Sequence, residues 1–326
     1  MTIFIQSFPT FFKALLVCVG IFFNSSVSLH AQASPHVQNF LAQHDLLLDV
    51  QLLANTDYTD ISVWKQKSTQ QGDNLSGELW TNTFYQYQYA LFNIEKGRIA
   101  RLTLYEPNGD IQKRYDFYYL DNLLSAIDEM KIDEKGKDLL ICTTIFFYEK
   151  SGRIFQQVRT FPREQGFREI MAYSFDTENK LIQTKVAYTG TPKQAQTLAR
   201  LGNGLELISY EYYGEKRTIN TYKNYNTLIK SLQYNTKEEL NVYGMNYVLE
   251  KKSKITYQGD LIKQIESTVL SMPTADVMQT FAPELFPLQE VQYFNYNDNH
   301  LILNHITEIG GEQIAYSYNY RAESYE

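Results

Sequence analysis

Histidine and cysteine, the side chains that most often bind metal or act as nucleophiles, are scarce in this chain. It contains 5 histidines and 2 cysteines in 326 residues. His300 and His305 are separated by an odd number of positions, which predicts opposite faces of a strand, and no third or fourth ligand for a tetrahedral metal site accompanies them. Cys142 lies in an apolar run, where we expect a buried and inert thiol. We therefore expect no metal site here.

Carboxylates are the next candidates, because a pair of them could serve a glycosidase or bind calcium. The most prominent are Asp116, Asp121, Asp176 and Asp298, and we place all four at or near turns, where Asp accepts backbone hydrogen bonds. The sequence has no GxSxG elbow, HExxH pair, phosphate-binding glycine loop or EF-hand. An enzyme is thus unsupported, and we predict a noncatalytic protein without a cofactor.

Tyrosine is the most informative residue type, because two short stretches carry it at every second position. Alternation places each set on one face of a strand. An exposed row could stack on sugar rings or hold a partner, whereas a buried row is the inner face of an amphipathic strand. Burying three tyrosines contributes on the order of 10 kcal/mol as an upper bound, which favours the core for most rows. The candidate ligand-face residues are Tyr85, Tyr87, Tyr89, Tyr316, Tyr318 and Tyr320.

The elements that must position these tyrosines are β-hairpins. The chain has 26 Tyr and 19 Phe but only 8 Pro and 16 Gly, a composition typical of strands. One unit recurs: an aromatic strand, a turn containing Asp, Asn, Gly or Lys, and a second strand that opens with Leu or Ile. The opening residues are Ile99, Ile111, Leu123, Ile154, Leu181, Leu228, Leu261 and Leu301. Their spacing is irregular, which indicates a meander with insertions rather than a solenoid.

These hairpin units predict a mainly β fold, an antiparallel meander of irregular hairpin repeats that forms a large curled sheet or an open barrel. Residues 36–55 are rich in Leu and Val, which predicts one or two short N-terminal helices that pack on the sheet. Residues 191–204 and 272–287 are expected to be helical or irregular insertions. We expect residues 34–83 to form a helical and lead-in segment, and residues 84–326 to form the hairpin-repeat domain.

The units resemble the YD repeats of bacterial Rhs-type wall and toxin proteins, in which a tyrosine pair and aspartate precede a turn glycine and a leucine. The best matches begin at Tyr118, Tyr173 and Tyr293, and the resemblance covers residues 93–306. This sequence departs from the pattern because the period drifts, Glu or Asn often replaces Asp, and several copies lack the glycine. The resemblance implies a curling antiparallel sheet and nothing about toxicity. The segment LYEPNGDIQKRY, from Leu104, also weakly resembles MORN-like repeats.

The first 33 residues predict a secretory signal peptide. Lys13 precedes an apolar run over residues 14–23, and small residues follow, ending in Ala31-Gln32-Ala33. This run is about half of the ~20 residues that span a bilayer, so we expect cleavage after Ala33 and no membrane span afterwards. The predicted location is extracytoplasmic, either periplasmic or secreted. Cys18 lies within the signal, so its removal leaves one cysteine and no disulfide.

The charge of the chain bears on its partners. The formal net charge is −7, and Lys and Arg are scattered rather than clustered, so we expect no nucleic-acid partner. Repeats without catalytic signatures favour an exported noncatalytic binding or scaffold protein with an unknown protein or glycan partner. Two alternatives stay open: a carbohydrate-binding or carbohydrate-processing protein, and a lipid or lipoprotein carrier with an apolar cavity inside a curled sheet.

Overall fold

The structure is a computed structural model that describes residues 34–54, 56–71, 80–133, 136–164, 166–190, 205–270 and 287–322. The predicted signal peptide, the insertion at 191–204 and nearly all of the insertion at 272–287 lie outside these residues.

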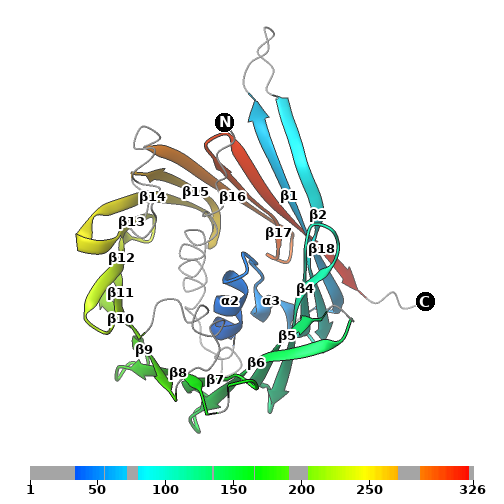
Figure 1. Ribbon diagram of the computed structural model, residues 1–326. Helices are drawn as coiled ribbons and strands as arrows, with labels where there is room; N and C mark the ends of the chain where they lie inside the picture. Colours follow the sequence, from blue (N-terminus) through cyan, green and yellow to red (C-terminus); the bar gives the residue numbers. More distant parts are fainter. Residues whose placement is uncertain are drawn as a thin grey trace.

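The described residues form one antiparallel sheet of 18 strands that closes into a barrel (Figure 1). Each strand pairs with its neighbours in the sequence, and β1 pairs with both β2 and β18. The strands are β1 (Tyr58–Gln71), β2 (Trp80–Glu95), β3 (Arg98–Tyr105), β4 (Ile111–Leu120), β5 (Leu123–Ile132), β6 (Asp138–Tyr148), β7 (Ile154–Thr160), β8 (Arg168–Phe175), β9 (Leu181–Thr189), β10 (Glu206–Tyr213), β11 (Lys216–Lys223), β12 (Thr227–Thr236), β13 (Glu239–Tyr243), β14 (Leu249–Gln258), β15 (Leu261–Val269), β16 (Leu288–Tyr296), β17 (Ile302–Ile309) and β18 (Glu312–Ala322).

Closure corrects the prediction of a curled sheet or open barrel. The mainly β, antiparallel hairpin arrangement is confirmed, but the sheet has no free edge between its first and last strands. The β1–β18 pairing runs from Tyr58 opposite Ala322 to Thr69 opposite Glu312. Closure pairs the backbone groups that an open sheet would leave exposed along two edges. We predicted that residues 34–83 form a separate lead-in segment, and this stays a prediction. Strand β1 and the start of β2 lie within these residues.

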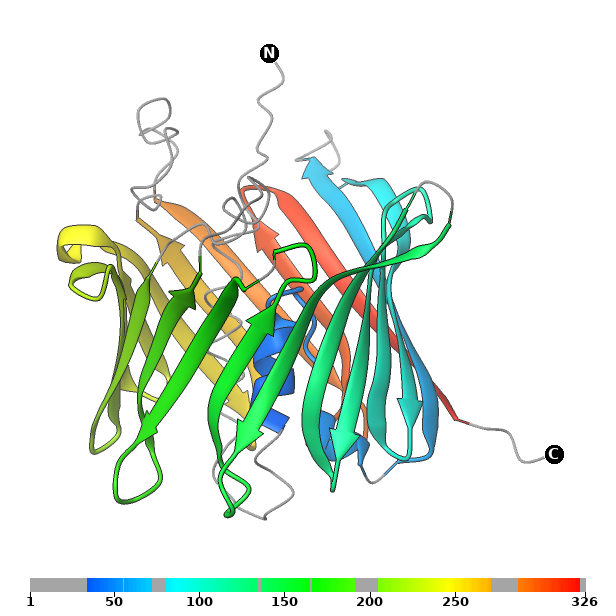
Figure 2. The same ribbon diagram turned by 60° about the horizontal axis from the view of Figure 1, so that its bottom comes forward.

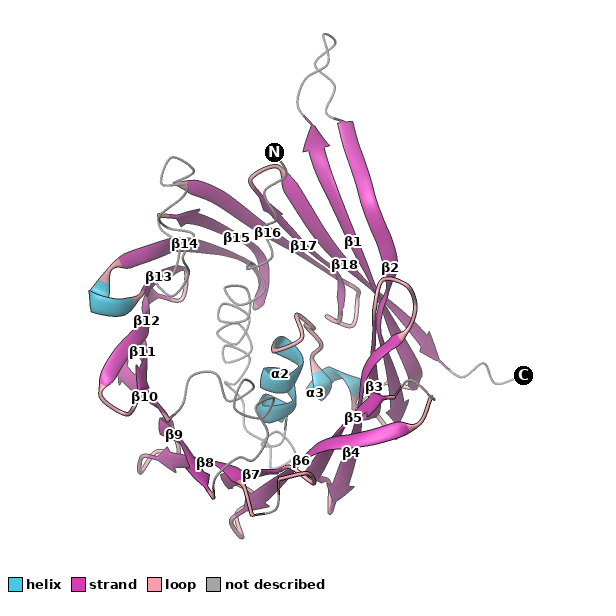
Figure 3. Ribbon diagram, viewed as in Figure 1, coloured by secondary structure: helices cyan, strands magenta, loops and turns pink. Residues whose placement is uncertain are grey.

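Two short helices, α2 (Ser34–Ala42) and α3 (Val50–Leu53), confirm the predicted helical region. They lie inside the ring of strands rather than outside it, as Figures 1 and 2 both show. The Asp49 carboxylate caps the N-terminus of α3, where it accepts hydrogen bonds from the backbone nitrogens of Gln51 (2.8 Å) and Leu52 (3.2 Å). One turn of 3-10 helix, Met245–Tyr247, joins β13 to β14 on the rim (Figure 3).

The core lies between these helices and the inner face of the wall. Leu41 and Leu53 of the helices are fully buried in one cluster with Ile61, Phe92 and Leu102 of the first three strands. The β2–β3 turn also packs tightly here, because a Cβ on Gly97 would stand 2.8 Å from the backbone of Ala54 at the end of α3. The helices therefore complete a core on one side of the barrel.

One polar row crosses the outer face of the wall from β11 to β16. Strand alternation points Leu240 into the core cluster and its neighbour Asn241 outward. The residues paired with Asn241 on neighbouring strands, and those paired with them in turn, form one outward row across six strands. Every residue of this row is polar. The row comprises Thr218, Gln233, Asn241, Lys252, Thr268 and Gln289.

Candidate lumenal binding site

Both predicted tyrosine rows line the lumen on strands that flank β1. In the register of the sheet, Lys65 of β1 stands opposite Tyr87 of β2 on one side and opposite Tyr316 of β18 on the other. Tyr316 and Tyr318 are buried in the core cluster, and Tyr320 packs against it. The barrel thus brings together two rows that lie more than 200 positions apart in the sequence.

The helical segment docks on these rows through three tyrosine hydroxyls. The Tyr89 hydroxyl donates a hydrogen bond to the His44 carbonyl (2.9 Å). The Tyr318 hydroxyl accepts one from the Leu47 backbone nitrogen (2.9 Å). A longer contact of 3.4 Å joins the Tyr316 hydroxyl to an Asp45 carboxylate oxygen. We call residues 34–54 the lumenal plug, because these bonds hold them against the inner wall.

A buried cation strengthens the same junction. The Lys65 ammonium lies 5.0 Å from the ring centres of both Tyr89 and Tyr316, a cation–π geometry. Burial lowers the pKa of Lys65, whereas the nearby negative charge of Asp45 raises it. Burial also raises the pKa of Tyr89 and of Tyr316, so both phenols are neutral at physiological pH. Sequence reasoning missed Lys65 and Asp45 because neither belongs to a local motif.

The two histidines that were weighed as metal ligands and rejected, His300 and His305, lie in different surroundings. His305 is fully buried on the inner wall, stacked between Phe294 (5.0 Å between ring centres) and Tyr316 (5.9 Å). Burial lowers its pKa to about 3. His300 lies in the turn before β17 with a φ of 61°, so the prediction that it is a strand residue was wrong. Among the described residues, no cluster of three or more His, Cys, Asp or Glu side chains could hold a metal ion.

The predicted carboxylates are spread around the molecule. Asp176 accepts backbone hydrogen bonds from Glu178 and Lys180 in a turn, as expected. Asp116 lies within β4 instead of at a turn, where Arg101 donates to it at 2.6 Å. The turn prediction for Asp116 was therefore wrong. Its partner Arg101 lies on the neighbouring strand β3, and the local sequence around Asp116 does not indicate this ion pair.

Cys142 is buried on β6, and the solvation lost by burial raises the pKa of its thiol. Its neighbourhood is charged as well as apolar. Arg159 lies 3.2 Å from Glu169 and 3.8 Å from Glu129. These carboxylates neutralise the guanidinium, and the raised pKa keeps the thiol protonated, which is the opposite of what a reactive cysteine requires.

Another part of the inner wall is polar and fully hydrogen-bonded. The Lys251 ammonium donates to both carboxylate oxygens of Glu290 at 2.8 Å, and the side chains are only 3% and 5% exposed. Gln292 donates to the same carboxylate at 2.6 Å. Ser253 and Ser267 share a hydrogen bond of 2.9 Å on adjacent strands. A lumen lined in this way is not a continuous apolar cavity.

The plug leaves one part of the tyrosine rows uncovered. Tyr85 and Tyr87 are only partly buried, and their ring centres lie 5.6 Å apart. Lys67 stands directly opposite Tyr85, and its ammonium lies 2.9 Å from the Glu312 carboxylate. We call Tyr85, Tyr87, Lys67 and Glu312 the lumenal tyrosine strip.

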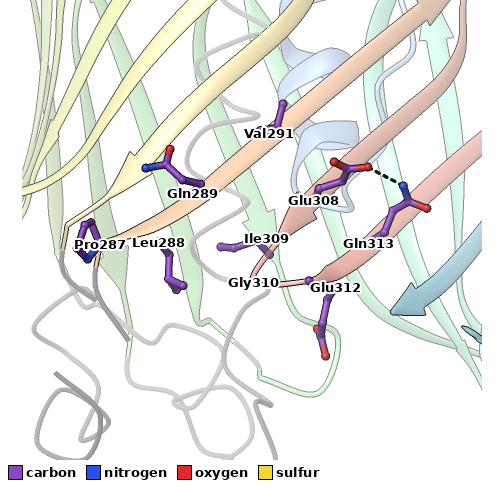
Figure 4. A pocket seen from close by; sticks show the side chains of 10 residues that line it. Pro287, Leu288, Gln289, Val291, Glu308, Ile309, Gly310, Glu312 and Gln313 are labelled. Carbon is purple, nitrogen blue, oxygen red and sulfur yellow. Dashed lines mark hydrogen bonds between the residues drawn. The ribbon is translucent and has the colours of Figure 1, made fainter. Parts of the chain in front are cut away.

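Glu312 also borders a cavity of about 330 Å³ at the β17–β18 turn. The cavity is lined by backbone and side chains at the start of β16, the end of β17 and the start of β18. Figure 4 shows that the Glu312 side chain extends away from Glu308 and Gln313, which are joined by a hydrogen bond of 2.8 Å. Because Gln289 belongs to the polar outer row, this cavity lies mainly on the outer face and meets the lumenal tyrosine strip only through Glu312 at the rim.

Fold and site together define the class of this protein: a closed 18-stranded antiparallel barrel with a helical plug docked on lumenal tyrosines. No family model matches the chain, and no curated protein matches it. Within the described part of the chain, no helix is both long enough and apolar enough to cross a membrane.

Several solved structures are similar at low identity. A porin-like protein from Bacteroides uniformis ATCC 8492 is 8% identical, with a TM-score of 0.30, over 82% of this chain and 97% of that one. A porin-like protein from Bacteroides vulgatus ATCC 8482 is 10% identical, with a TM-score of 0.20, over 78% and 97%. The TcdB2-TccC3-Cdc42 complex is 9% identical, with a TM-score of 0.30, over 77% of this chain and 16% of that one. The fold described above rests on the strand pairing of this chain alone.

Proposed function

We propose that this protein is an exported, noncatalytic binding protein whose ligand enters the lumen and contacts the lumenal tyrosine strip. One observation carries the proposal. The helical plug covers Tyr89, Tyr316 and Tyr318, whereas Tyr85 and Tyr87 remain partly exposed in the same row. Exposed aromatic rings cost the free energy that their burial would contribute, so a row of them is a suitable surface for a ligand.

A polar row on the outer face over β11–β16 and polar groups on part of the inner wall support contact with water in that part of the barrel, whereas exposed apolar residues such as Tyr118 and Ile145 lie on the outer face of β4–β6. The outer row across β11–β16 is uncharged or cationic and wholly polar, which suits water better than hydrocarbon. The N-terminal signal pattern supports an extracytoplasmic location, periplasmic or secreted. A scaffold that holds a protein partner on its outer face is the second form of the same proposal.

The lumen also bears on the lipid-carrier alternative. An acyl chain requires a continuous apolar cavity, because each polar group left without a hydrogen bond beside hydrocarbon costs free energy. The buried pair of Lys251 and Glu290 and the hydrogen-bonded serines Ser253 and Ser267 interrupt the inner wall. These groups favour a polar ligand over a lipid.

The hairpin units themselves support a proposal about origin, namely that the barrel is built from degenerate YD-type repeats. The units of the sequence coincide with antiparallel hairpins, such as β4–β5 at Tyr118 and β16–β17 at Tyr293. No argument about activity follows from this origin.

Native mass spectrometry of the protein recovered from its own host tests the proposed function. We expect a bound small molecule that is lost in Tyr87→Ala and retained in Tyr118→Ala, a matched control on the outer wall that is 47% exposed. Recovery of a ligand-free protein, with the same protein partner captured by both variants, would overturn lumenal binding in favour of the scaffold.

A further inference from the structure

The lumenal tyrosine strip presents a ladder of aromatic rings rather than a single ring. Ring centres lie 5.6 Å apart for Tyr85 and Tyr87, and 6.2 Å apart for Tyr87 and Tyr89. Tyr89 is held by the plug at one end, through its bond to the His44 carbonyl. The ladder is therefore fixed in position at its inner end and partly exposed at its outer end.

The phenols of the ladder are neutral. Burial raises the pKa of Tyr85, and Glu312 raises it further while Lys67 lowers it. Burial likewise raises the pKa of Tyr87 to about 12. Each hydroxyl can thus both donate and accept a hydrogen bond at physiological pH.

The two charges directly beside Tyr85 compensate each other, and the carboxylate of Glu106 is a further charge that raises the pKa of Tyr87. Lys67 and Glu312 form one ion pair at 2.9 Å, and their side chains are 27% and 39% exposed. An anion would be repelled by the carboxylate and a cation by the ammonium, so neither is favoured over a neutral ligand. A neutral ligand with many hydroxyls can instead use the free lone pairs of Glu312 and the remaining donors of Lys67.

We infer that the lumenal tyrosine strip binds a neutral oligosaccharide, whose apolar ring faces lie on Tyr85 and Tyr87 and whose hydroxyls bond to Lys67 and Glu312. This inference rests on the proposed lumenal binding function and names its ligand class. The observations that carry it are the tyrosine ladder and the ion pair of Lys67 and Glu312 beside it.

Isothermal titration calorimetry tests the inference with neutral hexasaccharides of glucose, xylose, mannose and N-acetylglucosamine. We expect at least one to bind, and Tyr87→Ala to weaken that binding about tenfold through loss of the ring face. Tyr87→Phe should bind within about threefold of the natural protein, because the ring remains. Tyr118→Ala, on the outer wall, should bind unchanged. Circular dichroism of each variant verifies that the barrel is folded.

The possible outcomes separate this inference from the proposed function. Binding that is equal in Tyr87→Ala and the natural protein overturns the assignment of the strip. If no hexasaccharide binds while native mass spectrometry still finds a ligand lost in Tyr87→Ala, the ligand class is wrong and lumenal binding stands. If neither a hexasaccharide nor a native ligand is found, both proposals fail.

Discussion

Replacement of Tyr318 by Phe isolates the contribution of one hydroxyl to docking of the lumenal plug. The side chain is 2% exposed, and its hydroxyl accepts a hydrogen bond of 2.9 Å from the Leu47 backbone nitrogen. Phe keeps the ring and its apolar contacts, so the change removes only the acceptor. A buried backbone N–H left without a partner costs about 1–3 kcal/mol, and we expect the free energy of unfolding to fall by that amount.

Two measurements check this expectation. Urea unfolding gives the change in stability, and hydrogen exchange of residues 44–48 reports whether the plug opens locally. The control is Tyr213→Phe, because Tyr213 is 86% exposed and its hydroxyl faces water. We expect that control to unfold within about 0.5 kcal/mol of the natural protein.

The reasoning is refuted by a clear result. Should Tyr318→Phe match the control in both stability and exchange, the Tyr318 hydroxyl contributes nothing to docking. The plug would then be held by apolar packing, through residues such as Leu41 and Leu53, and by the contacts of Tyr89 and Tyr316.

Three further perturbations probe other parts of the barrel. Glu290→Ala leaves the Lys251 ammonium buried without its carboxylate, so urea unfolding should show a loss of about 3–5 kcal/mol, and a loss below 1 would contradict burial of the pair. Burial lowers the pKa of His305 to about 3, so as pH falls the imidazole takes up a proton in the unfolded chain before it does so in the folded protein. The free energy of unfolding should therefore decline from about pH 6.5 towards pH 3. His305→Gln should remove that part of the pH dependence. Gly97→Ala should destabilise more than Gly109→Ala in thermal melts, because both glycines have positive φ but only the first would press a Cβ against the α3 backbone; equal losses would show that this contact yields freely.

Local chemistry made the hairpins predictable from the sequence. Turn residues with positive φ, such as Asn179 and Gly152, lie between strands that the aromatic and β-branched residues favour. Two short helices were likewise predictable from the apolar pattern of residues 36–55. The alternation of tyrosines also indicated which side chains share a face.

Closure and the assembly of the site were not predictable, because they depend on contacts between distant residues. Strand β1 pairs with β18 more than 240 positions away, and no local pattern specifies that partner. The same pairing brings Lys67 to Glu312 and Lys65 to Tyr316. Asp116 was misplaced for the same reason, since its arginine partner lies on a neighbouring strand.

Closure of the barrel through β1 and β18 has a consequence for how the chain is made. The first strand leaves the ribosome long before its second partner exists, so one edge of β1 stays unpaired until residues 312–322 are complete. The plug precedes β1 in the chain, and its docking tyrosines come from both β2 and β18. The wall must therefore form around a segment that is synthesised before it. Strand β18 completes both the closure of the barrel and the docking of the plug. A chain that stops short of β18 would have two open sheet edges and a plug without its contacts to Tyr316 and Tyr318.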